Sequence, residues 1–324
     1  MRHVVKIVNL FRIQLKYGGM KIGIKVGLKS NWKTDLEATK PDFCEIWFDS
    51  RRINDYSELF GFLKQQKIPA GLHFWGASPN GTLANLAYPD SEILTISRNL
   101  LRQTIDAAAR TQAVYVNFHP CGKILSRVDF EKEKFTPFTK LLPTSESLII
   151  LEESLSFASQ YANSLGVMLT VEATPKLAAG SPWTGKNGRM QPTTIGEFAV
   201  SEIEPLLKKL KLFFANDFGH TCSNIISTDR QEVKEFLFNI ARRLAHITKL
   251  LHVSYIVPPY NGTDYHGCLY YDELKSPTAI PNYDEMKQLL KLFVQRDDVM
   301  ALVEPEKDHI GNFQALINLV KEID

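Results

Sequence analysis

Short apolar runs recur along the whole chain, and segments with a helical period separate them. Eight of these runs are nearly continuous in apolar and β-branched residues, which is typical of strands that are covered on both faces. The predicted strands span 21–26, 43–48, 70–75, 113–118, 167–172, 212–217, 250–255 and 299–304. The pattern therefore predicts eight buried strands distributed over the length of the chain.

The segments between these runs carry apolar residues at intervals of three and four, as amphipathic helices do. Three such stripes are clear: Ile93, Ile96, Leu100, Ile105 and Ala108; Val233, Leu237, Ile240, Leu244 and Ile247; and Met286, Leu289 and Phe293. Further helices are predicted near 33–40, 54–67, 146–165, 193–210 and 310–322. Each predicted strand is thus followed by a predicted helix.

Alternation of strands and helices implies parallel strands joined by right-handed crossovers, and eight such units close into a (β/α)8 TIM barrel. An open doubly wound sheet is disfavoured because no glycine-rich phosphate turn follows the first strand. No linker divides the chain, so we expect one barrel over residues 20–324. Residues 1–19, which are basic and end in Gly18-Gly19, are expected to form an extension outside the core.

Composition narrows the function classes only slightly. The 324 residues carry a net charge of +2, which gives no general argument for a polyanionic partner. Four cysteines lie far apart with no CxxC pair, which favours reduced thiols in a cytoplasmic protein. No apolar stretch is long enough to predict a transmembrane helix, and no protein partner is predicted.

Histidines and carboxylates fall at or beside the C-terminal ends of six predicted strands. The six residues are His73, His119, Glu172, Asp217, His252 and Glu304. In a parallel barrel these strand ends converge on one face, where long connections (76–92, 119–144, 173–192 and 255–281) would build a pocket. Imidazole and carboxylate are the usual ligands of divalent metals, so the sequence predicts a metal site on that face.

Three more residues of the same types extend this set. His220 follows Asp217 in Asp-Phe-Gly-His, and Asp264 and His266 form Asp-Tyr-His. Nine ligands exceed the roughly four that one zinc ion takes, but they fit two or three ions that share bridging carboxylates. Clustered cations about 3.5–4 Å apart are the usual apparatus for attack on phosphate esters.

The ordered set of these motifs resembles the xylose isomerase-like TIM-barrel superfamily, and within it the endonuclease IV family (AP endonuclease family 2). That family's ligands occur in the order His, His, Glu, Asp-x-x-His, His, Asp-x-His, Glu. The order here is His73, His119, Glu172, Asp217 with His220, His252, Asp264 with His266, and Glu304. The resemblance covers about residues 20–310, and it is carried by the complete set because each motif alone is weak.

The resemblance implies a site with three ions, expected to be zinc. Glu172 would bridge two of them; His73 and His119 would bind one, and Asp217, His252 and Glu304 another. The third ion would be held by His220, Asp264 and His266. Hydroxide generated at the metals would hydrolyse a phosphodiester of damaged DNA and leave a nick 5′ to an abasic sugar.

Three functions remain open on the sequence. The first is the DNA hydrolase, supported by a loop without acidic residues that carries Lys186 and Arg189, with Trp183 among them, and that would contact phosphates. The second is a sugar or sugar phosphate isomerase or epimerase, with one divalent ion such as manganese and with Glu172 and Glu304 as the acid/base pair; Trp75 and Trp183 would stack on the sugar. The third is a non-catalytic protein on a barrel scaffold. The complete ligand set favours the first.

Overall fold

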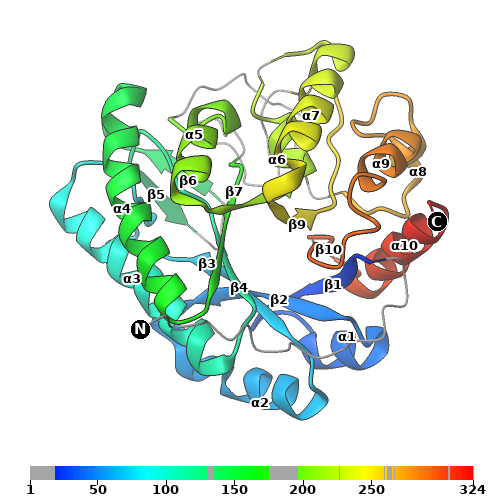
Figure 1. Cartoon of the computed structure of the whole chain (residues 1–324), viewed down its shortest axis with the longest axis horizontal. Coiled ribbons are helices and arrows are strands. Elements are labelled where there is room, and N and C mark those ends of the chain that lie inside the picture. The colour runs from blue at the N-terminus through cyan, green and yellow to red at the C-terminus, as the bar shows by residue number, and fades with distance from the viewer. Residues whose placement is uncertain are drawn as a thin grey trace, which may run out of the picture.

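The computed structural model of the chain is a closed barrel of parallel strands surrounded by helices (Figure 1). It describes residues 19–129, 134–174, 196–225, 227–258, 260, 265, 267–305 and 307–323. The strands follow one another around the barrel in the order β1-β10-β9-β8-β7-β4-β3-β2. The predicted (β/α)8 TIM barrel is therefore confirmed. Residues 1–18 lie outside the described ranges, so the N-terminal extension stays a prediction.

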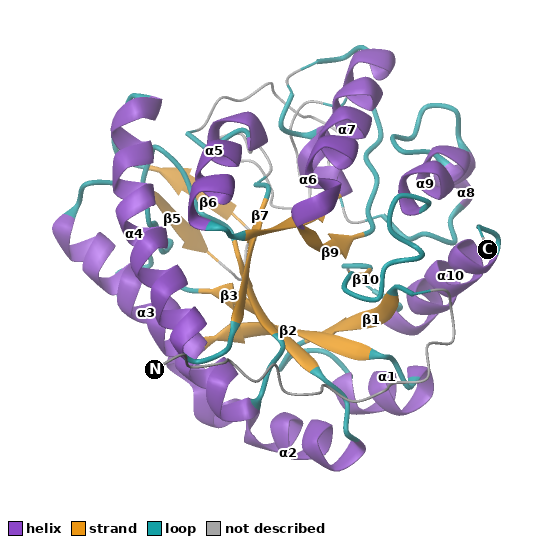
Figure 2. Ribbon diagram, in the orientation of Figure 1, coloured by secondary structure: helices purple, strands orange, loops and turns teal. Residues whose placement is uncertain are grey.

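The ring of strands encloses the barrel interior, and the helices lie outside it (Figure 2). The barrel strands are β1 (Lys21–Val26), β2 (Phe43–Asp49), β3 (Ala70–Trp75), β4 (Tyr115–Phe118), β7 (Met168–Glu172), β8 (Phe213–Asp217), β9 (Thr248–His252) and β10 (Met300–Leu302). The helices are α1 (Trp32–Thr39), α2 (Ser57–Gln66), α3 (Ser91–Thr111), α4 (Thr144–Ser164), α5 (Val200–Leu210), α6 (Phe218–Cys222), α7 (Arg230–Leu244), α8 (Asp272–Lys275), α9 (Tyr283–Leu290) and α10 (His309–Lys321). Short 3₁₀ segments are η1 (Ser50–Tyr56) and η2 (Ala245–Ile247).

Several element boundaries differ from the predicted ones for identifiable reasons. Strand β4 begins two residues late because the Ala113 N–H still bonds the carbonyl of Ala108 and closes α3. Strand β9 begins two residues early because Thr248 pairs with Phe214 of β8. Helix α5 begins only at Val200, and residues 54–56 belong to η1 rather than to α2.

One pair of strands was not predicted. Strands β5 (Ser126–Asp129) and β6 (Lys134–Pro137) form an antiparallel hairpin inside the long connection between β4 and α4. Their sequence lacks a long apolar run, so the sequence pattern predicts no strand there. The hairpin lies outside the barrel sheet, appears between the helices α4 and α5 in the view of Figure 1, and leaves the barrel topology unchanged.

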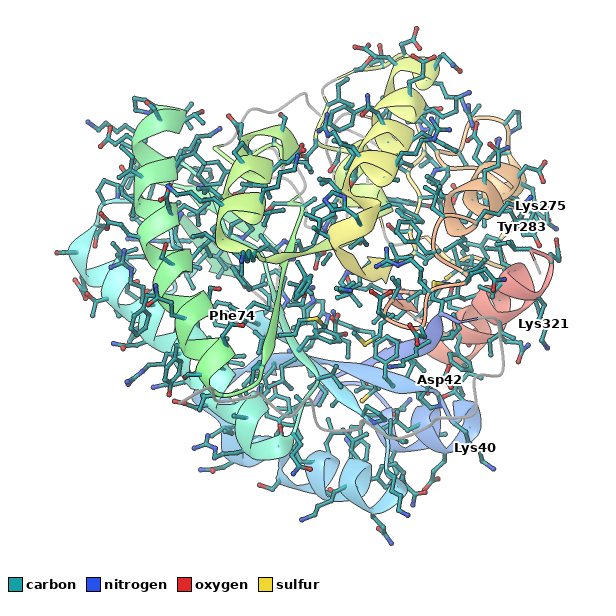
Figure 3. The ribbon with its side chains drawn as sticks, in the orientation of Figure 1. Lys40, Asp42, Phe74, Lys275, Tyr283 and Lys321 are labelled. Atoms are coloured by element: carbon teal, nitrogen blue, oxygen red, sulfur yellow. The ribbon has the colours of Figure 1, made fainter. Side chains whose placement is uncertain are left out.

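Successive side chains of each strand point alternately into the barrel and outwards to the helices, as the period of two requires. Phe74 of β3 lies on the outer side of the ring and is buried in the large apolar core under the helices (Figure 3). Asp42, just before β2, accepts a hydrogen bond from the Ile22 N–H of β1 at 2.9 Å and joins the starts of two strands. The four cysteines are free thiols. No helix in the described ranges is long and apolar enough to cross a membrane.

A small apolar layer fills the barrel interior below the strand C-termini. It consists of Phe43, Tyr115, Ala215, Leu250, Met300 and Leu302. Two glycines, each on the strand next to the one that carries the ring, make room for its rings: a Cβ added at Gly23 would overlap the Phe43 ring, and one added at Gly71 would overlap the Tyr115 ring. The layer closes the bottom of the barrel and supports the polar residues above it.

Substituting Gly71 by alanine is therefore expected to destabilise the fold by about 1–3 kcal/mol, the usual cost of overpacking a core. The reason is that the overlapping ring of Tyr115 is fully buried and cannot move aside. Urea unfolding measures the change. Gly61→Ala is the matched control because it lies in α2 with open space around it, and there alanine should stabilise the helix by roughly 0.5–1 kcal/mol. Equal effects of the two substitutions would contradict this account of the interior.

Candidate metal centre

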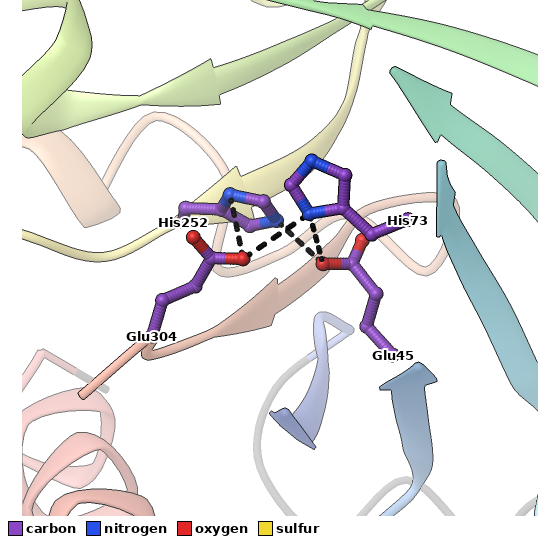
Figure 4. Close-up of side chains that lie close together, drawn as sticks. All are labelled: Glu45, His73, His252 and Glu304. Carbon is purple, nitrogen blue, oxygen red and sulfur yellow. Dashed lines mark ion pairs between the residues drawn. The ribbon is translucent and has the colours of Figure 1, made fainter. Parts of the chain in front are cut away.

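Polar and ionisable side chains gather in the barrel above the apolar layer. They occupy the same strand face as that layer, two or four residues further along each strand, so the period of two carries them into the interior. Glu45 of β2, His73 of β3, His252 of β9 and Glu304, two residues after β10, point toward one another (Figure 4). All four are buried, with at most 8% of the residue exposed.

One set of four residues offers ligand atoms that all lie within 4.8 Å of one another: Glu172, Asp217, His252 and Glu304. The His252 ring lies at its centre, with Nδ1 3.2 Å from Glu172 Oε1, 3.7 Å from Asp217 Oδ2 and 3.5 Å from Glu304 Oε1. Three carboxylates and one imidazole form a donor set suited to one divalent ion. We call these residues the four-residue set.

A second group shares Glu172 with the four-residue set. His73 Nε2 lies 3.6 Å from Glu172 Oε2, and His119 Nε2 lies 3.7 Å from Glu172 Oε1. The two imidazole rings stack with their centroids 5.2 Å apart. His73, His119 and Glu172 therefore also offer three ligand atoms within 4.8 Å of one another.

A lysine lies among these ligands. Lys25 Nζ donates to Glu45 Oε1 at 2.5 Å, contacts His73 Nδ1 at 2.5 Å and donates to Glu304 Oε1. Lys25 and Glu45 are also direct cross-strand partners of β1 and β2, and both side chains are buried. Tyr115 of the apolar layer donates its hydroxyl to Glu45 Oε2 at 2.9 Å and fixes that carboxylate from below.

Hydrogen bonds from neighbouring side chains orient the carboxylates Glu172 and Asp217. Asn117 donates its amide to Glu172 Oε2 and accepts in turn from Thr170 Oγ1 at 2.9 Å. Ser254 donates its hydroxyl to Asp217 Oδ1 at 2.7 Å. Such outer partners fix the ligands of a metal site and reduce the cost of ordering them when an ion binds.

Burial and the charges of neighbouring groups shift the pKa values of all four residues in the four-residue set. Burial opposes ionisation of Glu172 and Glu304, but His252 and the other nearby cationic groups outweigh it and hold the pKa of each carboxyl well below its usual range. Burial raises the pKa of Asp217. Burial also works against a charged His252 ring, but Glu172 and Glu304 raise the pKa of His252 well above its usual value.

Burial and charge shift the pKa values of two further basic groups, His119 and Lys25, in opposite directions. Burial lowers the pKa of His119 to about 3, which leaves a neutral imidazole suited to ligate a metal. Burial also disfavours the charged form of Lys25, but Glu304 and Glu45 outweigh it and raise the pKa of Lys25. Lys25 is therefore a buried ammonium ion.

The residues present fit a divalent cation. Four buried carboxylates (Glu45, Glu172, Asp217 and Glu304) lie together with the Lys25 ammonium and the His252 ring, and buried carboxylates are costly unless nearby positive charge compensates them. In addition, His73 Nε2 and His119 Nδ1 are buried and have no hydrogen-bond partner. A cation bound among these groups would compensate the excess negative charge.

Metal binding at the four-residue set should strengthen as the pH rises. Below its raised pKa the His252 ring carries a proton on both nitrogens, and Asp217 also retains its proton to higher pH than usual, so an ion must displace protons to bind. We expect the affinity for Mn²⁺ to rise by roughly tenfold per pH unit for each displaced proton between pH 5 and pH 7. Calorimetry in buffers of different ionisation enthalpy measures the protons released. A pH-independent affinity would place the ion elsewhere.

The structure brings together six of the nine ligands predicted from the sequence: His73, His119, Glu172, Asp217, His252 and Glu304. The seventh, His220, lies beside them with Nδ1 3.0 Å from Glu172 Oε1, although it belongs to none of the groups above. Asp264 and His266 lie outside the described residues, as do Trp183, Lys186 and Arg189 of the predicted substrate loop. A third ion therefore stays a prediction.

Sequence reasoning missed Lys25, Glu45 and the aromatic residue Trp47. Trp75, predicted as a substrate contact, lies 5.5 Å from Trp47 between ring centroids and 5.8 Å from the His119 ring. Trp47 is 40% exposed and Trp75 is partly exposed, so the two rings form one aromatic wall beside the ligands. Alternate residues of a strand point to the same side, and the missed residues point into the barrel like those that were predicted. On β2 the missed Glu45 and Trp47 follow Phe43 at intervals of two, as the predicted His73 and Trp75 follow Gly71 on β3.

Comparison with known proteins adds evidence on the fold. No model of a known protein family matches the sequence, and no curated protein matches it. Solved structures do match. A D-tagatose 3-epimerase-like protein superposes with a TM-score of 0.61 at 16% identity, covering 94% of this chain and 98% of the other. The 3-keto-D-glucoside 4-epimerase of E. coli gives 0.59 at 13% identity, covering 93% and 99%.

Endonuclease IV from Thermus thermophilus also superposes, with a TM-score of 0.55 at 13% identity, covering 93% of this chain and 99% of the endonuclease. At these identities the similarity concerns the fold. The chain thus has the barrel fold that sugar epimerases and endonuclease IV share, as its resemblance to xylose isomerase-like TIM barrels implied.

Proposed function

We propose that this protein is a divalent metal-dependent isomerase or epimerase that acts on a sugar or sugar phosphate. The observation that carries the proposal is the four-residue set, in which Glu172, Asp217 and Glu304 surround His252 within the reach of one ion. This set lies wholly within the described residues and contains two carboxylates that are ionised at neutral pH. These are the requirements for moving a proton next to a carbonyl group.

Glu172 and Glu304 would carry the proton. The bound ion would polarise the oxygen atoms of the substrate. Glu172 would then accept the proton from the carbon atom beside the carbonyl. Returning it to the neighbouring carbon, while a hydroxyl proton passes to the former carbonyl oxygen, would isomerise the sugar. Inversion of configuration would instead need Glu304, ionised at rest, to take up a proton from water and deliver it to the opposite face of the same carbon. Asn117 orients Glu172 for this step through its amide hydrogen bond.

The aromatic wall of Trp47 and Trp75 supports a carbohydrate substrate. Indole faces stack on the apolar C–H faces of sugars, and this wall lies beside His73 and His119 at the edge of the ligand groups. One of the proteins that share the fold is named as an epimerase of a sugar derivative, and another as a sugar epimerase-like protein. The substrate class is carried over from them as part of the proposal.

Phosphodiester hydrolysis is the second candidate, and the His73–His119–Glu172 group favours it. Two ions that share Glu172 would provide the paired cations used in attack on phosphate esters. On this reading the chain resembles endonuclease IV in function as well as in fold and cleaves DNA at abasic sites. Asp264, His266 and the loop with Trp183, Lys186 and Arg189 would then take part.

Two assays on the same manganese-loaded preparation test the proposal. A panel of ketohexoses, ketopentoses and their phosphates is incubated in D₂O, and NMR follows the exchange of C–H protons for deuterium. Duplex DNA with one abasic site is incubated in parallel, and strand nicking is measured. We expect deuterium incorporation into at least one sugar. Nicking of the DNA without exchange in any sugar would establish the hydrolase instead.

A further inference from the structure

We propose that the Lys25 ammonium is a built-in cation that fills one of the cation positions of this barrel and thereby limits the number of metal ions that bind. The proposal deepens the function given above and rests on the metal that this function requires. The proposal concerns another group of possible ligands, which shares His252 and Glu304 with the four-residue set but has Glu45 and His73 in place of Glu172 and Asp217. Glu45, His73, His252 and Glu304 offer ligand atoms within 4.8 Å of one another, as a metal site would.

Lys25 Nζ lies inside that group. It is 2.5 Å from Glu45 Oε1 and 2.5 Å from His73 Nδ1, and it bonds Glu304 Oε1. The side chain is 4% exposed, so its charge is held by protein groups rather than by water. A divalent ion cannot occupy this position while the ammonium is there, because the two would overlap and repel each other at low dielectric.

The ammonium also acts on the next group of ligands through His73. An ammonium has only hydrogens to offer, so Nδ1 of His73 must accept from it with its lone pair. The single proton of the neutral ring then sits on Nε2, the nitrogen that faces Glu172 Oε2 at 3.6 Å. A protonated nitrogen cannot ligate a metal, so Lys25 also opposes an ion at His73, His119 and Glu172. The four-residue set lacks His73, and Lys25 bonds one of its members, Glu304, which keeps a second carboxylate oxygen for the ion.

Contacts on two sides hold the Lys25 ammonium in this position. Its partner Glu45 is its direct neighbour across strands β1 and β2 and is held from below by the Tyr115 hydroxyl. On the other side Nζ lies 5.7 Å from the centre of the Trp47 ring, within the range of a cation–π contact. The barrel thus replaces one metal ion by a lysine and retains one set of ligands for a single ion.

The test is the number of ions per chain, measured by elemental analysis after saturation with zinc and removal of free metal. Lys25→Ala vacates the position and releases Nδ1 of His73, so it should bind one more ion per chain than the unmodified protein. Lys25→Arg, the matched control, keeps the charge and should bind the same number as the unmodified protein. Lys25→Ala combined with Glu45→Gln should lose the gained ion again, because the vacated position then lacks a carboxylate.

A measurement on the unmodified protein keeps the proposal testable if Lys25→Ala does not fold. In protein labelled with ¹⁵N-histidine and loaded with zinc, long-range ¹H–¹⁵N spectra should show His73 with its proton on Nε2; His73→Gln identifies its signals. A metal-bound Nε2 on His73, or an unchanged ion count in folded Lys25→Ala, would overturn the proposal. If Lys25→Ala gains its ion but no sugar is turned over, the inference about Lys25 stands and the proposed function fails.

Discussion

Glu172→Gln should lower the rate of sugar isomerisation or epimerisation by about 10³-fold or more. The amide cannot accept a proton from carbon, and loss of a positioned acid/base group alone typically costs 10²–10⁴-fold. Glutamine also replaces the carboxylate that belongs to both ligand groups, so the metal affinity should fall as well. The rate of C–H exchange in D₂O at saturating metal measures the effect.

The fold should survive this substitution. Glutamine has the same shape as glutamate, so the substitution leaves no cavity, and its amide oxygen can keep the hydrogen bond that Asn117 donates. Glu202→Gln is the matched control: Glu202 caps α5 and pairs with Lys123, away from the ligand groups, and the variant should keep full activity. A Glu172→Gln protein that is folded, binds metal and remains active would exclude Glu172 from proton transfer, whereas loss of folding would make it a structural residue.

The barrel could be predicted because eight apolar runs alternate with helical stripes, and this pattern allows few topologies. The residues at strand ends could be predicted for the same reason, since parallel strands bring their C-termini to one face. Lys25 and Glu45 were not found because they lie one layer deeper, before the strand ends. The sequence did contain a signal for them: each is a charged residue inside an apolar run, at a position whose side chain points into the barrel.

The pairing of Lys25 with Glu45 could not be read from the sequence even with that signal. It depends on the register of β1 against β2, which places the two residues opposite each other. That register places the Phe43 ring against Gly23, where an added Cβ would overlap the ring, and this packing is visible only in three dimensions. The hairpin of β5 and β6 escaped prediction for a related reason, because its strands do not contribute to the barrel core.

Removing divalent ions with a chelator should abolish activity and lower the melting temperature by about 5–10 °C. An ion present at a hundred to a thousand times its dissociation constant stabilises the folded state by about 3–4 kcal/mol, and for a chain of 324 residues each kcal/mol corresponds to roughly 1.5–2.5 °C. Without the ion, the carboxylates of the four-residue set repel one another in a site where all are at most 8% exposed. Scanning calorimetry with and without EDTA measures the shift, and adding back Mn²⁺ or Zn²⁺ should reverse it.

Asp217→Asn shows whether that shift belongs to the four-residue set. The amide keeps the shape of Asp217 but weakens it as a ligand, so the melting temperature of this variant should hardly respond to EDTA. The hydrogen bond that Ser254 donates to Oδ1 can be kept by the amide oxygen, which limits any loss of stability in the metal-free state. An EDTA-induced shift as large as that of the unmodified protein would mean that the stabilising ion binds outside the four-residue set. The metal-dependent proton transfer proposed for Glu172 and Glu304 would then lose its physical basis.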